Sequence, residues 1–407
     1  MVVYRNVQNT HRPTKSSLTL VIKVGTSSIC DETTHYPLLG NLSRIVETIL
    51  QLKRMGHRVV LVTSAAVGTG LRRLNMTEKP KKLAAIQAIA AVGQGRLMSM
   101  YDDLFGQFNQ PVAQILLTRN DLADRSQYLN AVNCLEELLD MGVVPIVNEN
   151  DTISVSEIKF GDNDTLSAIT AGMVKADYLF LMTDVDCLYT DNPRTNPKAR
   201  PILVCDDLDQ LREEVVVTSP GSALGTGGMV TKLVAADLAT AAGVTTVITR
   251  GATPENIVPI ISSEDDGTTT KLPLHTRFVA KPQPLIDRKW WILHGLHTAG
   301  TIYVDADVAE KIASGAARQG ASGASLFAHS IAKVEGNFVE HQAVRLIAQH
   351  TGENGVTDYV TVAKGIVNYS SAEICRIMRA KESYLVDSLG YKDADCIINR
   401  DNMAISI

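Results

Sequence analysis

Short runs of hydrophobic, often β-branched residues alternate with longer stretches of helical periodicity between Leu18 and about Arg250. Such short runs, bounded by turn residues, are typical of buried strands, whereas apolar positions repeated every three or four residues indicate helices. The predicted strands are 18–24, 58–62, 112–117, 143–147, 178–182 and 245–249, and the predicted helices lie around 42–53, 83–105, 129–141, 165–174 and 232–242. This order predicts an α/β fold with right-handed βαβ units and a mainly parallel sheet sandwiched by helices.

The hydrophobic pattern changes near residue 280. Lys281-Pro282-Gln283-Pro284 is typical of a stiff connector. Beyond it, short apolar runs and Gly-rich turns predict strands at 290–293, 300–304, 325–327, 331–335, 343–348 and 360–365, followed by a helix at 371–378. We therefore expect a tail at 1–17, a large domain at 18–280, a linker at 281–286 and a small β-barrel domain at 287–407.

Composition and charge exclude several classes of protein. The 407 residues suffice for two or three domains at roughly 100 to 200 residues each. The net charge of -5 gives no overall attraction for nucleic acid or an anionic membrane. The longest uncharged apolar stretch that looks helical, 83–95, is shorter than the roughly 20 residues that span a bilayer. The six cysteines are scattered, which indicates neither a zinc site nor disulfides and favours a reducing compartment, most simply the cytoplasm.

Two predicted strand ends carry groups suited to an anion. The first strand ends in Lys23, followed by a small turn with Gly25 and Thr26 whose backbone N–H groups could hold phosphate oxygens. A solvated lysine before a plain turn would give the same pattern. After the second strand, Ser64 precedes a predicted helix, where it could help bind an anion or serve only as an N-cap.

Amide and carboxylate side chains cluster at a third place. The apolar strand 143–147 is followed at once by Asn148-Glu149-Asn150-Asp151, and Gly161-Asp162-Asn163-Asp164 then opens a helix. Ligands of open α/β sheets bind at the carboxyl ends of the strands, and Asn and Asp together can hold an ammonium and a carboxylate group. Two ordinary Asx-rich turns are the alternative.

Two further segments suit a nucleotide. The polar strand exit beginning with Thr183 and Asp184 could hold a ribose and a base, and residues 221–228 contain four glycines shortly before Lys232. Such a loop loses much entropy on ordering, so it favours a close approach to a ligand over a spare linker. Two lysines, two glycine-rich turns and an acidic, amide-lined pocket together indicate phosphoryl transfer from a nucleotide.

Seven motifs then give the chain a family resemblance: IKVGTSS (22–28), QAIAAVGQGRL (87–97), LLTRND (116–121), IVNEND (146–151), FGDNDTLSA (160–168), LMTDVDCLYTDNPR (181–194) and GTGGMVTKL (225–233). They resemble the glutamate 5-kinases of the amino-acid kinase superfamily, which carry a C-terminal PUA-like domain. The resemblance implies phosphorylation of the γ-carboxylate of L-glutamate with ATP and Mg²⁺, the first step of proline biosynthesis, and inhibition by proline. It also implies a homo-oligomer and a possible glutamyl phosphate reductase partner.

The resemblance assigns roles by position. ATP would contact Lys23, Gly25, Thr26, Thr183, Asp184 and the segment Thr226, Gly227, Gly228, Met229, Val230, Thr231 and Lys232. Glutamate would contact Ser64, Asn148, Asp151 and Asn163, and the catalytic set would be Lys23, Lys232, Asp162 and Asp164. Either aspartate could hold the two ammonium groups or help to order magnesium, and no dedicated metal-ligand set is assigned.

Two departures from the family pattern and two rival interpretations remain. Ala65 follows Ser64 where the family usually has glycine, so its Cβ would hinder the turn if the turn requires positive φ or close approach of the substrate. Cys187 replaces another frequent glycine. Aspartate, acetylglutamate and UMP kinases of the same superfamily are alternatives, as is an RNA-binding protein with an inactive kinase domain. Residues 287–407 carry 12 Lys and Arg against 14 Asp and Glu, which does not favour RNA.

Overall fold

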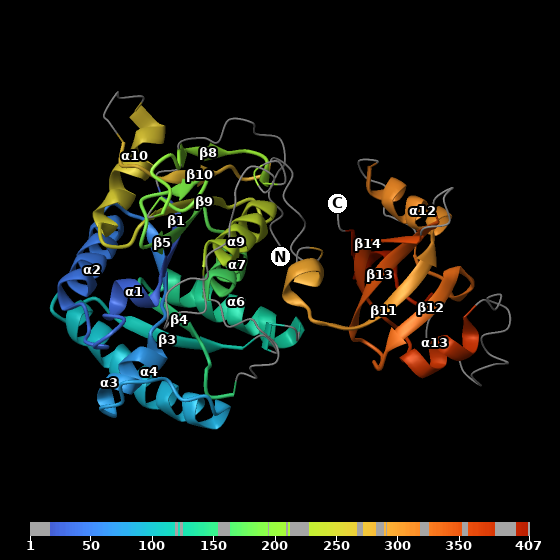
Figure 1. Ribbon diagram of the computed structural model, residues 1–407, viewed down its shortest axis with the longest axis horizontal. Coiled ribbons are helices and arrows are strands. Elements are labelled where there is room, and N and C mark those ends of the chain that lie inside the picture. The colour runs from blue at the N-terminus through green and yellow to red at the C-terminus, as the bar shows by residue number, and fades with distance from the viewer. Residues whose placement is uncertain are drawn as a thin grey trace. The chain divides into compact units, whose positions relative to one another are not determined.

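The computed structural model describes residues 17–118, 121–122, 125–153, 163–193, 195–208, 211, 228–266, 272–281, 289, 291–317, 325–351, 357–378 and 396–405. The chain divides into two compact units, Met1–Pro284 and Leu285–Ile407, shown in Figure 1. Most of the expected linker at 281–286 and nearly all of the expected tail at 1–17 lie outside the described residues, so these boundaries stay predictions.

The first unit is built on an eight-stranded sheet in the order β3-β4-β2-β1-β5-β9-β10-β8. All described pairings are parallel except that between β10 and β9. The strands are β1 (Thr19–Val24), β2 (Arg58–Val62), β3 (Val112–Leu117), β4 (Val144–Glu149), β5 (Tyr178–Thr183), β8 (Val204–Cys205), β9 (Thr245–Arg250) and β10 (Thr276–Phe278), and β6 (Leu188–Tyr189) and β7 (Pro201–Ile202) form a separate ribbon. The predicted fold class is confirmed.

Helices cover both faces of this sheet, as Figure 1 shows for α2 and α10 on one side and α7 and α9 on the other. They are α1 (Thr26–Ile29), α2 (Leu39–Arg54), α3 (Ala66–Arg73), α4 (Leu83–Gly106), α6 (Arg125–Asp140), α7 (Asn163–Met173), α9 (Met229–Ala241) and α10 (Ile257–Asp266), with the short 3₁₀ turn Pro254–Asn256 before α10. The five helices predicted from periodicity all occur.

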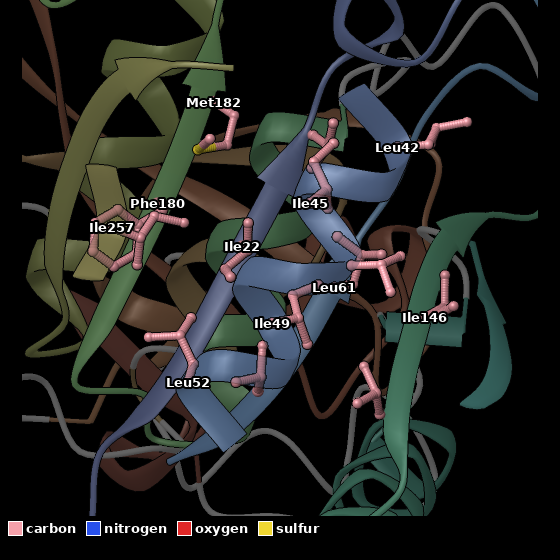
Figure 2. Packing of buried hydrophobic residues seen from close by; sticks show 14 of the residues in the cluster. Ile22, Leu42, Ile45, Ile49, Leu52, Leu61, Ile146, Phe180, Met182 and Ile257 are labelled. Carbon is pink, nitrogen blue, oxygen red and sulfur yellow. The ribbon is translucent and has the colours of Figure 1, made fainter. Parts of the chain in front are cut away.

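Strand alternation separates the core from the polar site. Ile22 and Phe180 point to the face covered by α2, where they pack with Ile45 and Ile49 in the cluster that Figure 2 shows. Because successive side chains of a strand point to opposite faces, Lys23 must point away from α2, toward the face covered by α7. The hydrophobic core therefore directs this buried lysine toward the beginning of α7.

The second unit contains a five-stranded mixed sheet in the order β12-β11-β13-β14-β15. Its elements are β11 (Thr298–Asp305), α12 (Ala306–Ala317), β12 (Ile331–Gly336), β13 (Ala343–Thr351), β14 (Thr357–Ile366), α13 (Ser371–Ile377) and β15 (Met403–Ile405), with 3₁₀ turns at Ala328–Ser330 and Arg400–Asn402. Side chains of the sheet and both helices form its own core, which includes Ile302, Leu346 and Ile374.

Two predicted strands of this unit are wrong. At 325–327 only Leu326 is paired, in an isolated bridge with Ile398. The sequence predicted a strand at 290–293, but Trp291–Gly295 forms a π-helical turn. The ammonium group of Lys364, on β14, donates to the carbonyl oxygens of Leu293 and Leu296. These hydrogen bonds attach the turn to β14. A short apolar run does not by itself distinguish strand from helix. In the part of the chain that the structure describes, no helix is long and apolar enough to cross a membrane.

Candidate active site

A carboxylate between two lysines forms the centre of the site. Asp164 lies in the first turn of α7, and its side chain is completely buried. Its Oδ1 lies 2.7 Å from Nζ of Lys23, at the end of β1, and its Oδ2 lies 3.0 Å from Nζ of Lys232, in the first turn of α9. Thr231 donates its hydroxyl to the same Oδ2 at 2.8 Å. The fold thus joins both predicted lysines through one aspartate.

The charges in this cluster are strongly coupled. Burial alone would raise the pKa of Asp164, but the ammonium groups of Lys23 and Lys232 outweigh it and hold the pKa well below its usual range. Asp164 is therefore ionised at neutral pH. Two ammonium groups and one carboxylate give the three side chains a net charge of about +1. A buried cluster with excess positive charge is suited to an anion such as a transferring phosphoryl group.

An amide-lined cluster lies next to the lysine pair. The side-chain NH₂ of Asn163 donates to Oγ of Ser64 at 3.0 Å and to Oδ1 of Asn148 at 3.1 Å. The amide nitrogen of Asn148 in turn donates to Oε1 of Gln94 at 2.8 Å. Since Asn163 directly precedes Asp164, the start of α7 carries one residue of each cluster. Three of the four predicted glutamate contacts are therefore side by side.

Gln94 is a site residue that sequence reasoning missed. It lies in the middle of α4, and apart from its place in one family motif nothing in the local pattern distinguishes it from a helix surface residue. Its amide nitrogen and Oδ1 of Asn163 are buried without a hydrogen-bond partner in the described part of the chain. The cluster therefore holds one donor and one acceptor suited to a ligand.

The turn between β2 and α3 is strained. Ala65 caps α3 with φ 77° and ψ 14°, in the left-handed region that non-glycine residues avoid. Ala65 thus occupies a turn whose φ is positive, the conformation in which its Cβ is unfavourable. The strained turn places Ser64 in the amide cluster and leads directly into α3.

Helices α3 and α4 are in backbone contact behind the cluster. A Cβ at Gly70 would lie 2.0 Å from the carbonyl oxygen of Ile89, and one at Gly93 would lie 1.8 Å from that of Ala66. Only glycine fits at these two positions. This contact fixes Gln94, next to Gly93, relative to the turn that carries Ser64.

Other predicted site residues lie at the same edge of the sheet. Thr183 ends β5, and its hydroxyl donates to Oδ1 of Asp184 at 3.1 Å. Gly25 follows Lys23 and caps the short α1. Asp151 follows β4, and burial, reinforced by the charge of Glu149, raises its pKa to about 6.

Some predicted residues are not described by the structure. Asp162, Thr226 and Gly227 lie outside the described residues, so their roles stay predictions. Gly228 caps α9, and Met229, Val230, Thr231 and Lys232 form its first turn. Among the described residues, no group of three or more His, Cys, Asp or Glu side chains is arranged to hold a metal ion.

Comparison with known proteins identifies the family. Residues 19–250 match the Amino acid kinase family, and residues 300–386 match the PUA domain. The chain is thus an amino acid kinase followed by a PUA domain. It is 52% identical over 398 residues to the "Probable glutamate 5-kinase" of Schizosaccharomyces pombe, covering 97% of this chain and 95% of that protein. Within the amino acid kinases, the chain belongs to the glutamate 5-kinase family.

A second relative agrees with this assignment. The glutamate 5-kinase of Synechococcus elongatus is 47% identical over 392 residues, covering 96% of this chain and 100% of that protein. Among solved structures, carbamate kinase from Giardia lamblia bound to AMP-PNP matches with a TM-score of 0.46 and 15% identity, covering 65% of this chain and 99% of that one. The resemblance stated from the sequence motifs is confirmed.

Proposed function

We propose that this chain uses ATP to phosphorylate the γ-carboxylate of L-glutamate, giving L-glutamyl 5-phosphate, the first step of proline biosynthesis. The observation that carries the proposal is the bridging of Lys23 and Lys232 by Asp164, directly beside the amide cluster of Ser64, Asn148 and Asn163. This places a phosphate-neutralising group next to a pocket suited to an α-amino acid. Membership of the glutamate 5-kinase family supports the choice of substrate.

The reaction needs no general base. The attacking group is a carboxylate that is already ionised at pH 7, so the protein has to orient the two substrates and neutralise charge. We assign that neutralisation to the ammonium groups of Lys23 and Lys232. A γ-carboxylate oxygen of glutamate bonds to the γ-phosphorus of ATP while the bond from that phosphorus to the β–γ bridging oxygen breaks. Negative charge shifts to the leaving ADP, and these two preorganised cations stabilise it.

Asp164 acts as a positioning residue in this scheme. Its Oδ1 forms an ion pair with Lys23 and its Oδ2 accepts from Lys232 and Thr231, so we propose that it holds the two ammonium groups apart at the place where the substrates meet. Thr183, Asp184, Gly25 and Thr26 are proposed to contact the nucleotide. The undescribed segment of Thr226 and Gly227 is proposed to approach its phosphates.

Glutamate is proposed to bind through the amide cluster. Within the described residues, Oδ1 of Asn163 and the amide nitrogen of Gln94 have no partner, so the first can accept from the substrate ammonium and the second can donate to a carboxylate. Asp151 supplies a negative charge for the same ammonium group. Ser64 and Asn148 complete the contacts.

Magnesium is proposed to enter with ATP and to neutralise its phosphates. Lys23, Lys232 and Thr231 already contact both oxygens of Asp164, so this carboxylate does not suit a metal ligand. Mg²⁺ keeps several waters and often binds substrate phosphates. We therefore assign its coordination to ATP oxygens and water, with Asp184 as the nearby carboxylate.

The labile product gives a direct test. Hydroxylamine should trap the acyl phosphate as a hydroxamate when glutamate, ATP and Mg²⁺ are present. A hydroxamate formed with glutamate, and no turnover with acetylglutamate or UMP, is the expected result. Turnover with aspartate or UMP but none with glutamate would overturn the proposal.

Several expectations of regulation and assembly go with this function. We propose that proline competes with glutamate, because the pocket fits an α-amino acid, and that the chain forms a homo-oligomer in the cytoplasm. Transfer of the labile product to a glutamyl phosphate reductase is proposed for the same chemical reason. Calorimetry in which proline binds undiminished under saturating glutamate would contradict competition.

A further inference from the structure

A second hollow, of about 400 Å³, lies in the kinase unit, and none of its lining residues belongs to the active site described above. Its wall consists of the turn before α2, the C-terminal end of α3 and the middle of α4. Three arginines contribute to it: Arg72 and Arg73 from α3, and Arg96 from α4. No Asp or Glu side chain lines it. The hollow is therefore strongly basic.

The three guanidinium groups lack carboxylate partners in the described part of the chain. Arg72 donates instead to the hydroxyl of Tyr36 at 2.6 Å and to Oδ1 of Asn75 at 3.3 Å, and its guanidinium carbon lies 3.9 Å from the centre of the Tyr36 ring. These contacts fix the orientation of Arg72 without neutralising it. Arg96 donates only to Oγ of Ser99, at 3.3 Å. Three positive charges thus surround one cavity.

A buried histidine also contributes to the hollow. The side chain of His35 is 4% exposed, and its backbone has φ 58°, in the left-handed region. Nε2 lies 3.3 Å from the carbonyl oxygen of Thr77, whereas Nδ1 is buried without a hydrogen-bond partner in the described residues. The nearby carboxylate of Asp31 accepts from Thr33 and Thr34 within its own turn. This buried nitrogen is therefore available to a ligand group in the hollow.

A purely structural role does not account for this set. Basic residues at the end of α3 favour the negative end of the helix dipole, which explains Arg72 and Arg73. Arg96, however, lies in the middle of α4, and His35 lies in a turn. Their convergence with Arg72 on one cavity therefore needs another reason.

We propose that this hollow binds a phosphate group, either as free inorganic phosphate or as part of a phosphorylated small molecule. Guanidinium groups match phosphate oxygens in paired hydrogen bonds, and a dianion fits three unneutralised cations better than a single carboxylate does. The remaining N–H groups of Arg72 and those of Arg73 and Arg96 would donate to the oxygens. Nδ1 of His35 would complete the contacts.

The site is placed to influence glutamate binding. Helix α3 begins beside Ser64 and ends at Arg72 and Arg73, about 10 Å away at 1.5 Å per residue. Helix α4 carries both Gln94 and Arg96. Because the two helices are in backbone contact at Gly70 and Gly93, and Arg96 lies only two residues from Gln94, a ligand in the hollow can shift the amide cluster.

Calorimetry on the full chain tests the binding. Inorganic phosphate is titrated at constant ionic strength with AMP-PNP and Mg²⁺ saturating the nucleotide site, and glycerol phosphate is titrated in parallel to distinguish a free phosphate from a phosphate ester. We expect the double variant R72Q/R96Q to bind phosphate at least tenfold more weakly than the unmodified chain. The exposed Arg54, on α2, provides the matched control R54Q, which should bind normally.

Equal phosphate binding by the unmodified chain and R72Q/R96Q would overturn the proposal, as would the absence of any binding under saturating AMP-PNP. If the double variant fails to fold, the single variant R96Q replaces it. Arg96 is exposed, so R96Q should fold, and it should still bind phosphate more weakly than the unmodified chain. A second readout, the effect of phosphate on the KM for glutamate, rests on the proposed function. The calorimetric result does not, so the two can fail separately.

Discussion

The ammonium group of Lys23 lies 2.7 Å from Oδ1 of Asp164, although the two residues come from different strand and helix elements far apart in the chain. Lys232 contacts the other oxygen of the same carboxylate at 3.0 Å. Both lysines are almost completely buried, so Asp164 compensates two charges that water does not reach. This one side chain therefore links the stability of the fold to the geometry of the active site.

Replacing Asp164 with asparagine should destabilise the protein as well as inactivate it. The substitution keeps the shape but leaves two buried ammonium groups without a negative partner, which typically costs about 3 to 5 kcal/mol. Urea unfolding of D164N at pH 7 measures the loss. The depressed pKa of Asp164 means that its contribution is present above about pH 4 and is lost as the pH falls further. Unchanged unfolding at pH 7 would contradict the charge argument.

Replacing Lys232 with methionine should lower kcat by roughly 10²-fold to 10³-fold, the scale for removing one preorganised electrostatic donor. The KM values for ATP and glutamate should change far less, because the lysine acts mainly in the transition state. Steady-state kinetics of K232M give both values. The exposed Lys198 provides a control, K198M, that should keep normal kcat. A near-normal kcat in K232M would leave Lys23 as the only catalytic lysine.

The sequence predicted the framework well because its strands are short, buried and bounded by turns. All six strands predicted in the first unit occur, within one or two residues of the predicted ends. It could not predict β10 or β15, since three residues carry too little pattern. The strand expected at 290–293 failed because its apolar residues fit a helical turn equally well.

Sequence spacing identified most residues of the candidate site, but it did not show which of them contact one another. Lys23, Lys232 and Asp164 were predicted, but the choice between Asp162 and Asp164 as the residue that holds the lysines depends on tertiary packing. Gln94 was missed because a polar residue within a helix usually faces solvent. The close contact of α3 with α4 at Gly93 buries it instead.

The elevated pKa of Asp151 predicts a pH dependence of glutamate binding. Its carboxylate has a pKa of about 6, so it is mostly ionised at pH 7 and mostly neutral at pH 5. If only the ionised form holds the substrate ammonium, the KM for glutamate should rise about tenfold between these two pH values. The KM for ATP should be the same at both pH values. In D151N the KM for glutamate should be high at both pH values, and a retained pH dependence would assign it to another group.

Replacing Gln94 with leucine should weaken glutamate binding selectively. The change removes the acceptor for the amide of Asn148 and leaves a buried donor unsatisfied, a loss of about 1 to 3 kcal/mol. We expect the KM for glutamate to rise roughly tenfold or more, since 1.4 kcal/mol corresponds to a factor of ten. The KM for ATP should be unchanged. Gln107, at the C-terminal end of the same helix, offers the control Q107L. Equal effects on both substrates would place Gln94 outside the glutamate pocket.

The left-handed conformation of Ala65 predicts that a smaller side chain is tolerated there and a larger one is not. Glycine would relieve a strain of roughly 1 to 2 kcal/mol, but it would also lose a buried methyl group and gain freedom in the unfolded chain. These effects offset one another, so A65G should unfold within about 1 kcal/mol of the unmodified protein, whereas the β-branched side chain of A65V should destabilise it by more than about 2 kcal/mol. Urea unfolding of both variants tests this order. If A65V were as stable as the unmodified chain, the turn before α3 would not require positive φ. The position of Ser64 in the amide cluster would then need another explanation.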